Sequence, residues 1–246
     1  MTQATFTDAV RSHIAADRSM LNVSIPAVIT SYDPITQKCS CQPLIDSLLR
    51  DERLVRMPIL EDIPVMFPST QLSALTFPVN VTDTVLLVFS QRSLDNWLAT
   101  RDTNPVNPED FRKHDLSDAI AIPGLFSFPR AINDPSKHTL LHDTDDLVIS
   151  HNLGSPNENE IRLESNGTIK ISAGEGTKIT LNLDGTMTID APTTLAVTSP
   201  TTTWVGDINV TGTVTATTDV VGGGKSLATH VHSGVTTGGS NTGVPV

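Results

Sequence analysis

The chain has 246 residues, a formal net charge of -11 and a pI near 4.9, and it is long enough for one large or two ordinary domains. Such an acidic chain is not expected to hold nucleic acid by neutralising phosphates, nor to carry a basic patch for a membrane surface. The first twenty residues show no secretory signal, and no apolar run reaches the roughly 20 residues of a membrane-spanning helix.

Aromatic residues divide the chain into two parts. Every Trp, Tyr and Phe except Trp204 lies at or before Phe128. The long remainder is therefore poorly equipped to build a core of its own. Because it still alternates like β-strand, we expect a repetitive β structure that finds its core in neighbouring chains.

The N-terminal part begins with an expected amphipathic helix over residues 5–21. Thr5 or Thr7 can cap it, and its apolar face is a spaced set of residues: Phe6, Val10, Ile14 and Leu21. Nothing in this segment suits catalysis, so we interpret it as a docking helix.

From residue 25 to about residue 89 the pattern changes to short strands separated by turn signals such as Asp33-Pro34. Several short strands at this spacing predict a small antiparallel barrel, and an OB-type barrel fits the size. The only cysteines, Cys39 and Cys41, have no second Cys or His pair at metal spacing. We expect them to be ordinary strand residues on one face.

Residues 90–130 are less regular. A short helix carrying Trp97 is expected, followed by a mixed-charge cluster around Phe111 that contains Asp110, Arg112, Lys113, His114, Asp115 and Asp118. We interpret this cluster as a solvated loop, since no paired carboxylate and nucleophile converge with it.

After a linker near residues 133–136, short alternating strands follow one another, most of them separated by Gly, Asn, Asp or Pro. Their sequences are DLVISHN, NEIRLES, GTIKISA, TKITLNL, GTMTIDA, TLAVTS, DINVTG and TVTATTD. The short, imperfect period favours a β-solenoid-like or intertwined β-helical shaft over a propeller. A threefold assembly would fill its narrow core and remove exposed strand edges.

The tail contains His230 and His232, with no other His, Cys, Asp or Glu from residue 225 to residue 246. In an extended strand residues i and i+2 face the same side, about 6.5 Å apart, so both imidazoles can reach one metal ion. Two ligands are too few for a tight site. Either the pair is incidental, or other copies supply the missing ligands. Three chains about an axis would offer six nitrogens, which favours iron or nickel over four-coordinate zinc.

Several stretches resemble the central spike, or membrane-piercing, proteins of contractile-tailed bacteriophage baseplates, of the baseplate assembly protein V-like kind. Four stretches are similar to the N-terminal barrel of these spikes, and one is similar to their tip: PAVITSYDPITQKCSCQPLI, LEDIPVMFPS, LTFPVNVTDTVLLVFSQRSLDNWL, RKHDLSDAIAIPGL and GGGKSLATHVHSGVTTGGSNTGVP. The ending T-H-x-H-x-G…G…T-G-x-P is the most specific of these signals.

The resemblance implies a mainly β homotrimer in four parts: an N-terminal helical segment (1–24), an OB-fold domain (25–130), an intertwined trimeric β-helix shaft (131–226) and a spike tip (227–246). It implies that His230 and His232 of three chains bind one iron ion per trimer, rather than zinc or nickel. Small residues, among them Gly234, Gly238, Gly239, Ser240 and Gly243, can fold back tightly around such an ion.

The implied function is mechanical: tail contraction drives the spike through the bacterial outer membrane, and the protein catalyses nothing. The implied partners are two further copies and, through the N-terminal domain, tail hub or baseplate proteins, with no nucleic acid. The implied location is the tip of the virion's tail, after assembly in the host cytoplasm.

Three other functions remain open. A tailspike depolymerase would need paired carboxylates in a groove; the acids available to it are Asp143, Asp145, Asp146, Glu158 and Glu160, with only Trp204 as an aromatic. A receptor-binding tail fibre would bind its target without any catalytic residues. The spike of a related contractile injection or secretion apparatus would share the same physics.

Overall fold

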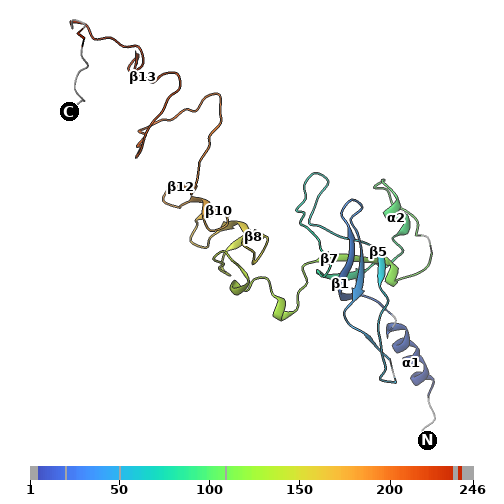
Figure 1. Ribbon diagram of the computed structural model, residues 1–246. Coiled ribbons are helices and arrows are strands. Elements are labelled where there is room, and N and C mark those ends of the chain that lie inside the picture. The colour runs from blue at the N-terminus through green and yellow to red at the C-terminus, as the bar shows by residue number, and fades with distance from the viewer. Residues whose placement is uncertain (1–4, 20, 50, 109, 235–237, 240–246) are drawn as a thin grey trace. The chain divides into compact units, whose positions relative to one another are not determined.

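The computed structural model describes residues 5–19, 21–49, 51–108, 110–234 and 238–239, and these are mainly β (Figure 1). The mainly β class predicted from the sequence is confirmed. The chain divides into two compact units, residues 1–192 and residues 193–246. No helix among the described residues is long and apolar enough to cross a membrane.

The first element is the helix α1 (Phe6–Ser19). Its start is fixed by a reciprocal pair, as in a capping box. The Thr5 hydroxyl accepts the Asp8 N–H (3.3 Å), and the Asp8 carboxylate accepts the Thr5 N–H (3.0 Å) and hydroxyl (2.6 Å). The expected cap at Thr5 is therefore present. The apolar side chains of Phe6, Val10 and Ile14 are exposed.

A curled five-stranded sheet forms the N-terminal β domain (Figure 1). In sheet order its strands are β5 (Leu60–Pro64), β2 (Lys38–Pro43), β1 (Ser24–Asp33), β6 (Thr84–Phe89) and β7 (Ala119–Pro123). All four neighbouring pairs are antiparallel. The two outer strands meet through a parallel bridge between Val65 and Ala121, and the Met66 N–H donates to the Ala121 carbonyl at 2.9 Å. The sheet is thus a half-barrel whose edges touch at one point.

Two irregularities in register curve this sheet, one between Ile29 and Ser31 on β1 and one between Cys39 and Cys41 on β2. Its concave side holds the core, in which both cysteines are buried with their sulfurs 3.4 Å apart. The expected single face for both thiols is confirmed. The largest fully buried apolar side chains of this core are Ile29, Ile63, Leu87 and Val85.

Loops and short elements complete this domain. They are the hairpin β3 (Ser47–Leu48) and β4 (Leu54–Val55), the helix α2 (Asp95–Ala99), and the 3-10 turns η1 (Leu116–Asp118) and η2 (Phe128–Arg130). The expected short helix with Trp97 is α2. The expected turn at Asp33-Pro34 is also present, where the Asp33 carboxylate accepts the Ile35 N–H (2.9 Å) and the Thr36 hydroxyl (2.6 Å).

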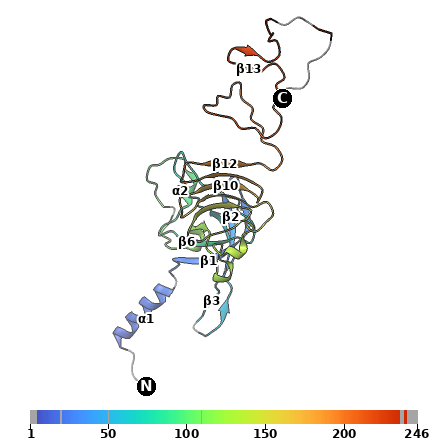
Figure 2. The same cartoon turned by 90° about the vertical axis from the view of Figure 1, so that its left-hand side faces the viewer.

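After the 3-10 turn η3 (Pro135–Lys137), five strands form a second sheet in which sequence neighbours pair antiparallel (Figure 2). They are β8 (Leu147–His151), β9 (Asn159–Leu163), β10 (Ile169–Ala173), β11 (Thr177–Leu181) and β12 (Met187–Asp190). The first five strands predicted for the shaft are confirmed. Within one chain they form a meander, in which each strand pairs with the next.

Three strands are predicted between residues 193 and 219, but the structure describes this whole segment and has no strand in it. This corrects the sequence-based expectation. The physical reason lies in pairing: a β-strand needs a neighbour for its backbone N–H and C=O groups, and no strand among the described residues pairs with this segment. The only strands in the described part of the second unit are β13 (Val221–Gly222) and β14 (Lys225–Ser226).

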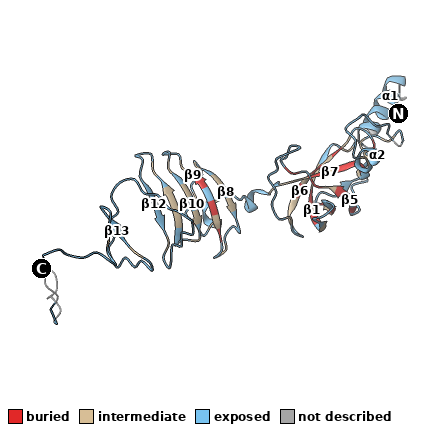
Figure 3. Ribbon diagram, turned by 90° about the horizontal axis from the view of Figure 1, so that it is seen from above, coloured by how far each residue is buried: buried red, intermediate tan, exposed pale blue. Residues whose placement is uncertain are grey.

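The accessible surface of the chain is unusually large. It measures 19795 Å², against roughly 10,600 Å² expected for a folded monomer of this mass. Buried residues concentrate in the curled sheet and in β9, whereas α1, β12 and β13 are exposed (Figure 3). One copy alone therefore leaves much of its apolar surface in water.

Candidate functional site

The two histidines singled out by the sequence lie directly after a tight hairpin. Strands β13 and β14 are joined by Gly223 and Gly224, whose φ angles of 55° and 76° are those of a turn that favours glycine at both positions. The Leu227 N–H donates to the Val220 carbonyl at 2.8 Å, and the Asp219 carboxylate accepts the Ala228 N–H at 3.1 Å. The hairpin thus fixes where the histidine segment begins.

The segment from Ser226 to His230 is itself a compact loop. The Ser226 hydroxyl accepts the Thr229 N–H at 2.9 Å, and the Ser226 carbonyl accepts the His230 N–H at 3.2 Å. The His230 Nδ1 lies 3.0 Å from the Ser226 carbonyl oxygen and 3.2 Å from that of Leu227. A carbonyl can only accept, so Nδ1 carries the hydrogen and Nε2 keeps its lone pair.

The structure brings His230 and His232 together. Their ring centroids are 5.1 Å apart, at an interplanar angle of 76°, and both residues are exposed. A metal-binding histidine commonly donates its other ring N–H to a carbonyl, as His230 does, so the pair suits a metal that prefers imidazole.

The described residues supply only two imidazoles at this point. Among them no group of three or more His, Cys, Asp or Glu side chains could hold an ion. The expectation that copies of the chain complete a site at this pair stays a prediction. Ser240 and Gly243, named in the expected fold-back of the tip, lie outside the described residues.

The second sheet has an apolar face that nothing in the chain covers. Strand register aligns two rows of side chains across all five strands, Leu147–Leu163–Ile169–Leu181–Met187 and Ile149–Ile161–Ile171–Ile179–Ile189. Nine of these ten side chains are exposed, and Ile179 is half-buried. A soluble monomer normally buries such a face, so its exposure here is the feature that calls for a partner.

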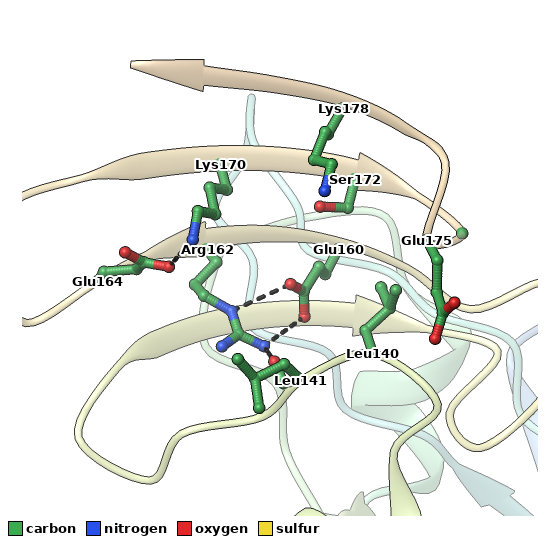
Figure 4. A pocket seen from close by; sticks show the side chains of 10 residues that line it. Leu140, Leu141, Glu160, Arg162, Glu164, Lys170, Ser172, Glu175 and Lys178 are labelled. Carbon is green, nitrogen blue, oxygen red and sulfur yellow. Dashed lines mark hydrogen bonds and ion pairs between the residues drawn. The ribbon is translucent and has the colours of Figure 1, made fainter. Parts of the chain in front are cut away.

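The opposite, charged face of the same sheet is the better buried one. The linker residues Leu140 and Leu141 lie over it and line a hollow of about 400 Å³ (Figure 4). Arg162 on β9 is 3% exposed and makes two 3.0 Å bonds to the Glu160 carboxylate and one of 3.3 Å to Asp146. On the adjacent strand Lys170 pairs with Glu164.

These contacts bear on the acids considered for a depolymerase. Glu160 and Asp146 neutralise Arg162, and the Glu158 carboxylate accepts backbone N–H groups of the linker. Each of these carboxylates therefore has a structural partner within the chain. Trp204, the one aromatic of this half, belongs to the other compact unit.

The mixed-charge cluster around Phe111 is more ordered than a solvated loop. Arg112 makes a two-bonded ion pair with Asp118, at 2.7 and 2.9 Å, and it also contacts Asp95 at 2.7 Å and Asp110 at 3.1 Å. Asp118 is fully buried, and its carboxylate also accepts the Leu94 N–H at 2.9 Å. The prediction of a solvated loop was wrong for Asp118, whose hydrogen bonds from Arg112 lower its pKa despite burial.

Two comparisons with known families place these parts. Residues 25–124 match the family described as phage protein Gp138 N-terminal domain, and residues 226–246 match the GpV Apex motif. The first match spans the curled sheet, and the second begins at Ser226 and includes His230 and His232. A search of curated proteins finds no match to this chain.

A phage N-terminal domain followed by a spike apex defines a structural protein of the phage virion, which assembles with other phage proteins. Within that class the two matches are consistent with a central spike protein of the baseplate protein V-like kind. The resemblance predicted from the sequence is confirmed.

Proposed function

We propose that the chain is a non-enzymatic spike that pierces the bacterial outer membrane during tail contraction, with His230 and His232 of three copies holding one iron ion at the apex. The single observation that carries this proposal is the tautomer of His230. Its Nδ1–H is committed to backbone carbonyls, which leaves Nε2 as a ligand nitrogen within a segment that matches a metal-binding apex.

Three copies follow from two demands of the chain. The apolar face of the second sheet needs a cover, and the segment from 207 to 220 needs strand partners. In that segment every odd position is Asp, Asn or Thr, and the even positions carry mostly apolar or small residues: Ile208, Val210, Gly212, Val214, Ala216 and Val220. An intertwined trimeric β-helix over residues 131–226 would bury the apolar side of the second sheet and of the segment 207–220, and it would leave their polar sides in water.

The N-terminal domain, 25–130, is proposed to be an OB-type barrel. Its five strands and their single parallel contact fit a partly open Greek-key barrel. We assign it, together with the helix in segment 1–24, to the attachment of the spike to tail hub or baseplate proteins. Assembly is proposed to take place in the host cytoplasm.

The ion would link three chain ends that have no aromatic core to hold them. Iron is preferred to zinc because six imidazole nitrogens suit six-coordinate geometry. The chain's own part is to hold each imidazole in one tautomer and to present it on the short β13–β14 hairpin. Slow unfolding of interlocked chains, rather than equilibrium stability, would let the needle survive contraction.

Native mass spectrometry of the full chain tests the site and the copy number together. We expect three chains with one ion of the mass of iron, and loss of that ion in a His230→Ala/His232→Ala variant. The matched control is His13→Ala, which removes an exposed histidine from α1. A metal-free monomer would contradict the proposal.

A second experiment tests the function itself, by removing residues 227–246 from virions. Lost penetration with normal adsorption supports the piercing spike. Altered adsorption with normal penetration would favour a receptor-binding fibre instead. Activity of the chain in a contractile apparatus without a phage head would favour the related injection machine.

A further inference from the structure

The linker that precedes the second sheet is anchored through one buried carboxylate. Glu158, in the turn before β9, is 1% exposed. Its Oε2 accepts the N–H groups of Thr139 (2.5 Å), Leu140 (3.3 Å) and Gly154 (3.2 Å). Its Oε1 lies 2.8 Å from Nδ1 of His138. The Glu158 carboxylate thus accepts the backbone N–H groups that the carbonyls of a neighbouring strand would otherwise accept.

The ring nitrogens of His138 both have polar contacts. Nε2 lies 2.9 Å from the carbonyl oxygen of Ile132, which can only accept, so Nε2 carries a hydrogen. Nδ1 faces Glu158, whose other oxygen already accepts three N–H groups and which is therefore held ionised. Nδ1 thus lies beside an acceptor as well, so both ring nitrogens of the buried His138 side chain face oxygen atoms.

A second histidine lies flat against this ring. The centroids of His138 and His142 are 3.9 Å apart, with planes 4° from parallel. His142 Nε2 lies 2.9 Å from Oδ1 of Asn133, while its buried Nδ1 has no partner among the described residues. Burial and the charge of His138 lower the pKa of His142, as does Arg162, against the opposite effect of Glu160 and Glu158. The stack therefore places a second titratable ring, with one unpartnered buried nitrogen, directly against His138.

We propose that His138, Glu158 and His142 form a proton-dependent clasp that holds the linker on the second sheet only while His142 is neutral. When His142 gains a proton at low pH, its buried ring takes up a charge directly against the ring of His138, and the clasp opens. The pH window in which the clasp is closed therefore ends where His142 takes up its proton.

The acid side of the window follows from the sign of the shift. Because the pKa of His142 is lowered from 6.5 in the folded chain, the unfolded chain binds more protons between the two values. The contribution of His142 to stability is therefore complete above 6.5 and is lost as the pH falls toward the lowered pKa. The pKa of Glu158 is also lowered: burial opposes this, but the Thr139 N–H and the other donors outweigh it. Its protonation therefore adds to the loss in stronger acid.

Hydrogen exchange of the full chain, corrected for the intrinsic effect of pH, tests the clasp from about pH 5 to about pH 9. We expect the amides of residues 138–142 to lose protection toward the acid end of this range. Glu158→Gln should lower that protection at least about tenfold. Glu164→Gln, which changes an acid on the same sheet, should leave it unchanged.

His142→Phe separates a clasp from a merely well-packed linker. The phenyl ring can stack on the ring of His138 but cannot take a proton, so the acid-side loss of protection should disappear. Protection that is flat with pH in the unsubstituted chain would overturn the proposal. So would an acid-side loss that survives in His142→Phe. Neither result depends on whether the chain is a membrane-piercing spike.

Discussion

Ile161 and Ile171 lie directly opposite each other on β9 and β10, and both side chains belong to the uncovered face of the second sheet. Lys170, one residue before Ile171, lies opposite Arg162 in the strand register, and both side chains belong to the charged face of the sheet. Successive residues of one strand therefore lie on two different faces: an exposed apolar face, and a charged face whose side chains form ion pairs with one another. This contrast gives the first prediction.

Ile171→Lys should prevent association of the chain, because it places a charge in the middle of the apolar face. Light scattering after size-exclusion chromatography would measure the expected fall in molecular mass. Ser172→Lys, one position along on the charged face, is the matched control and should leave the mass unchanged. Equal masses for both variants and the parent would mean that the apolar face is not an interface.

Asp118→Asn should destabilise the N-terminal domain by about 3–5 kcal/mol, because it leaves Arg112 beside a buried, uncharged partner. Thermal unfolding followed by circular dichroism would show the loss as a lower Tm. Asp110→Asn removes an exposed contact of the same guanidinium and should cost no more than about 1 kcal/mol. If both variants unfold at the same temperature, the buried ion pair contributes no more to stability than the exposed contact.

The same ion pair sets an acid limit to stability. Hydrogen bonds from Arg112 hold the pKa of Asp118 below its ordinary value of 3.8 against the effect of burial. The stabilisation is complete above 3.8 and is lost as the pH falls through the lowered pKa. Unfolding midpoints measured along an acid titration should therefore fall more steeply in the parent than in Asp118→Asn. Parallel curves would argue against this assignment.

Gly224→Val should weaken the β13–β14 hairpin by about 1–3 kcal/mol, because its φ of 76° is strained for a β-branched residue. If the hairpin positions His230, the ratio of bound iron to chains should fall, as measured by elemental analysis of the purified protein. Gly222→Ala is the control, since a Cβ there meets nothing within 4 Å and no left-handed φ is required. Undiminished iron in Gly224→Val would separate the ion from the hairpin.

Sequence patterns were sufficient to predict the elements that are determined by residues close together in the sequence. Alternation placed the strands β8 to β12, and the Thr5 cap placed the start of α1. Alternation also predicted an apolar face for the second sheet. It could not predict that the charged face would be the covered one, because the linker over it contributes only Leu140 and Leu141.

The contacts missed by sequence reasoning join residues that no motif links. His138 and Glu158 are separated by 20 positions, and each is unremarkable in its own segment. Arg112 and Asp118 are close in sequence, but only the curled sheet shows that Asp118 is buried. The strands expected between residues 193 and 219 are absent for a different reason: the alternating pattern is present, but no described segment of the chain pairs with it.

The uncovered face of the second sheet also constrains synthesis. A newly made chain leaves the ribosome with two rows of apolar side chains exposed on this face, and these can bind another copy or, wrongly, an unrelated exposed strand. Chains translated from one messenger emerge close together, which raises their local concentration at the critical moment. Production from a scarce or widely dispersed messenger should therefore yield aggregate in place of virion protein.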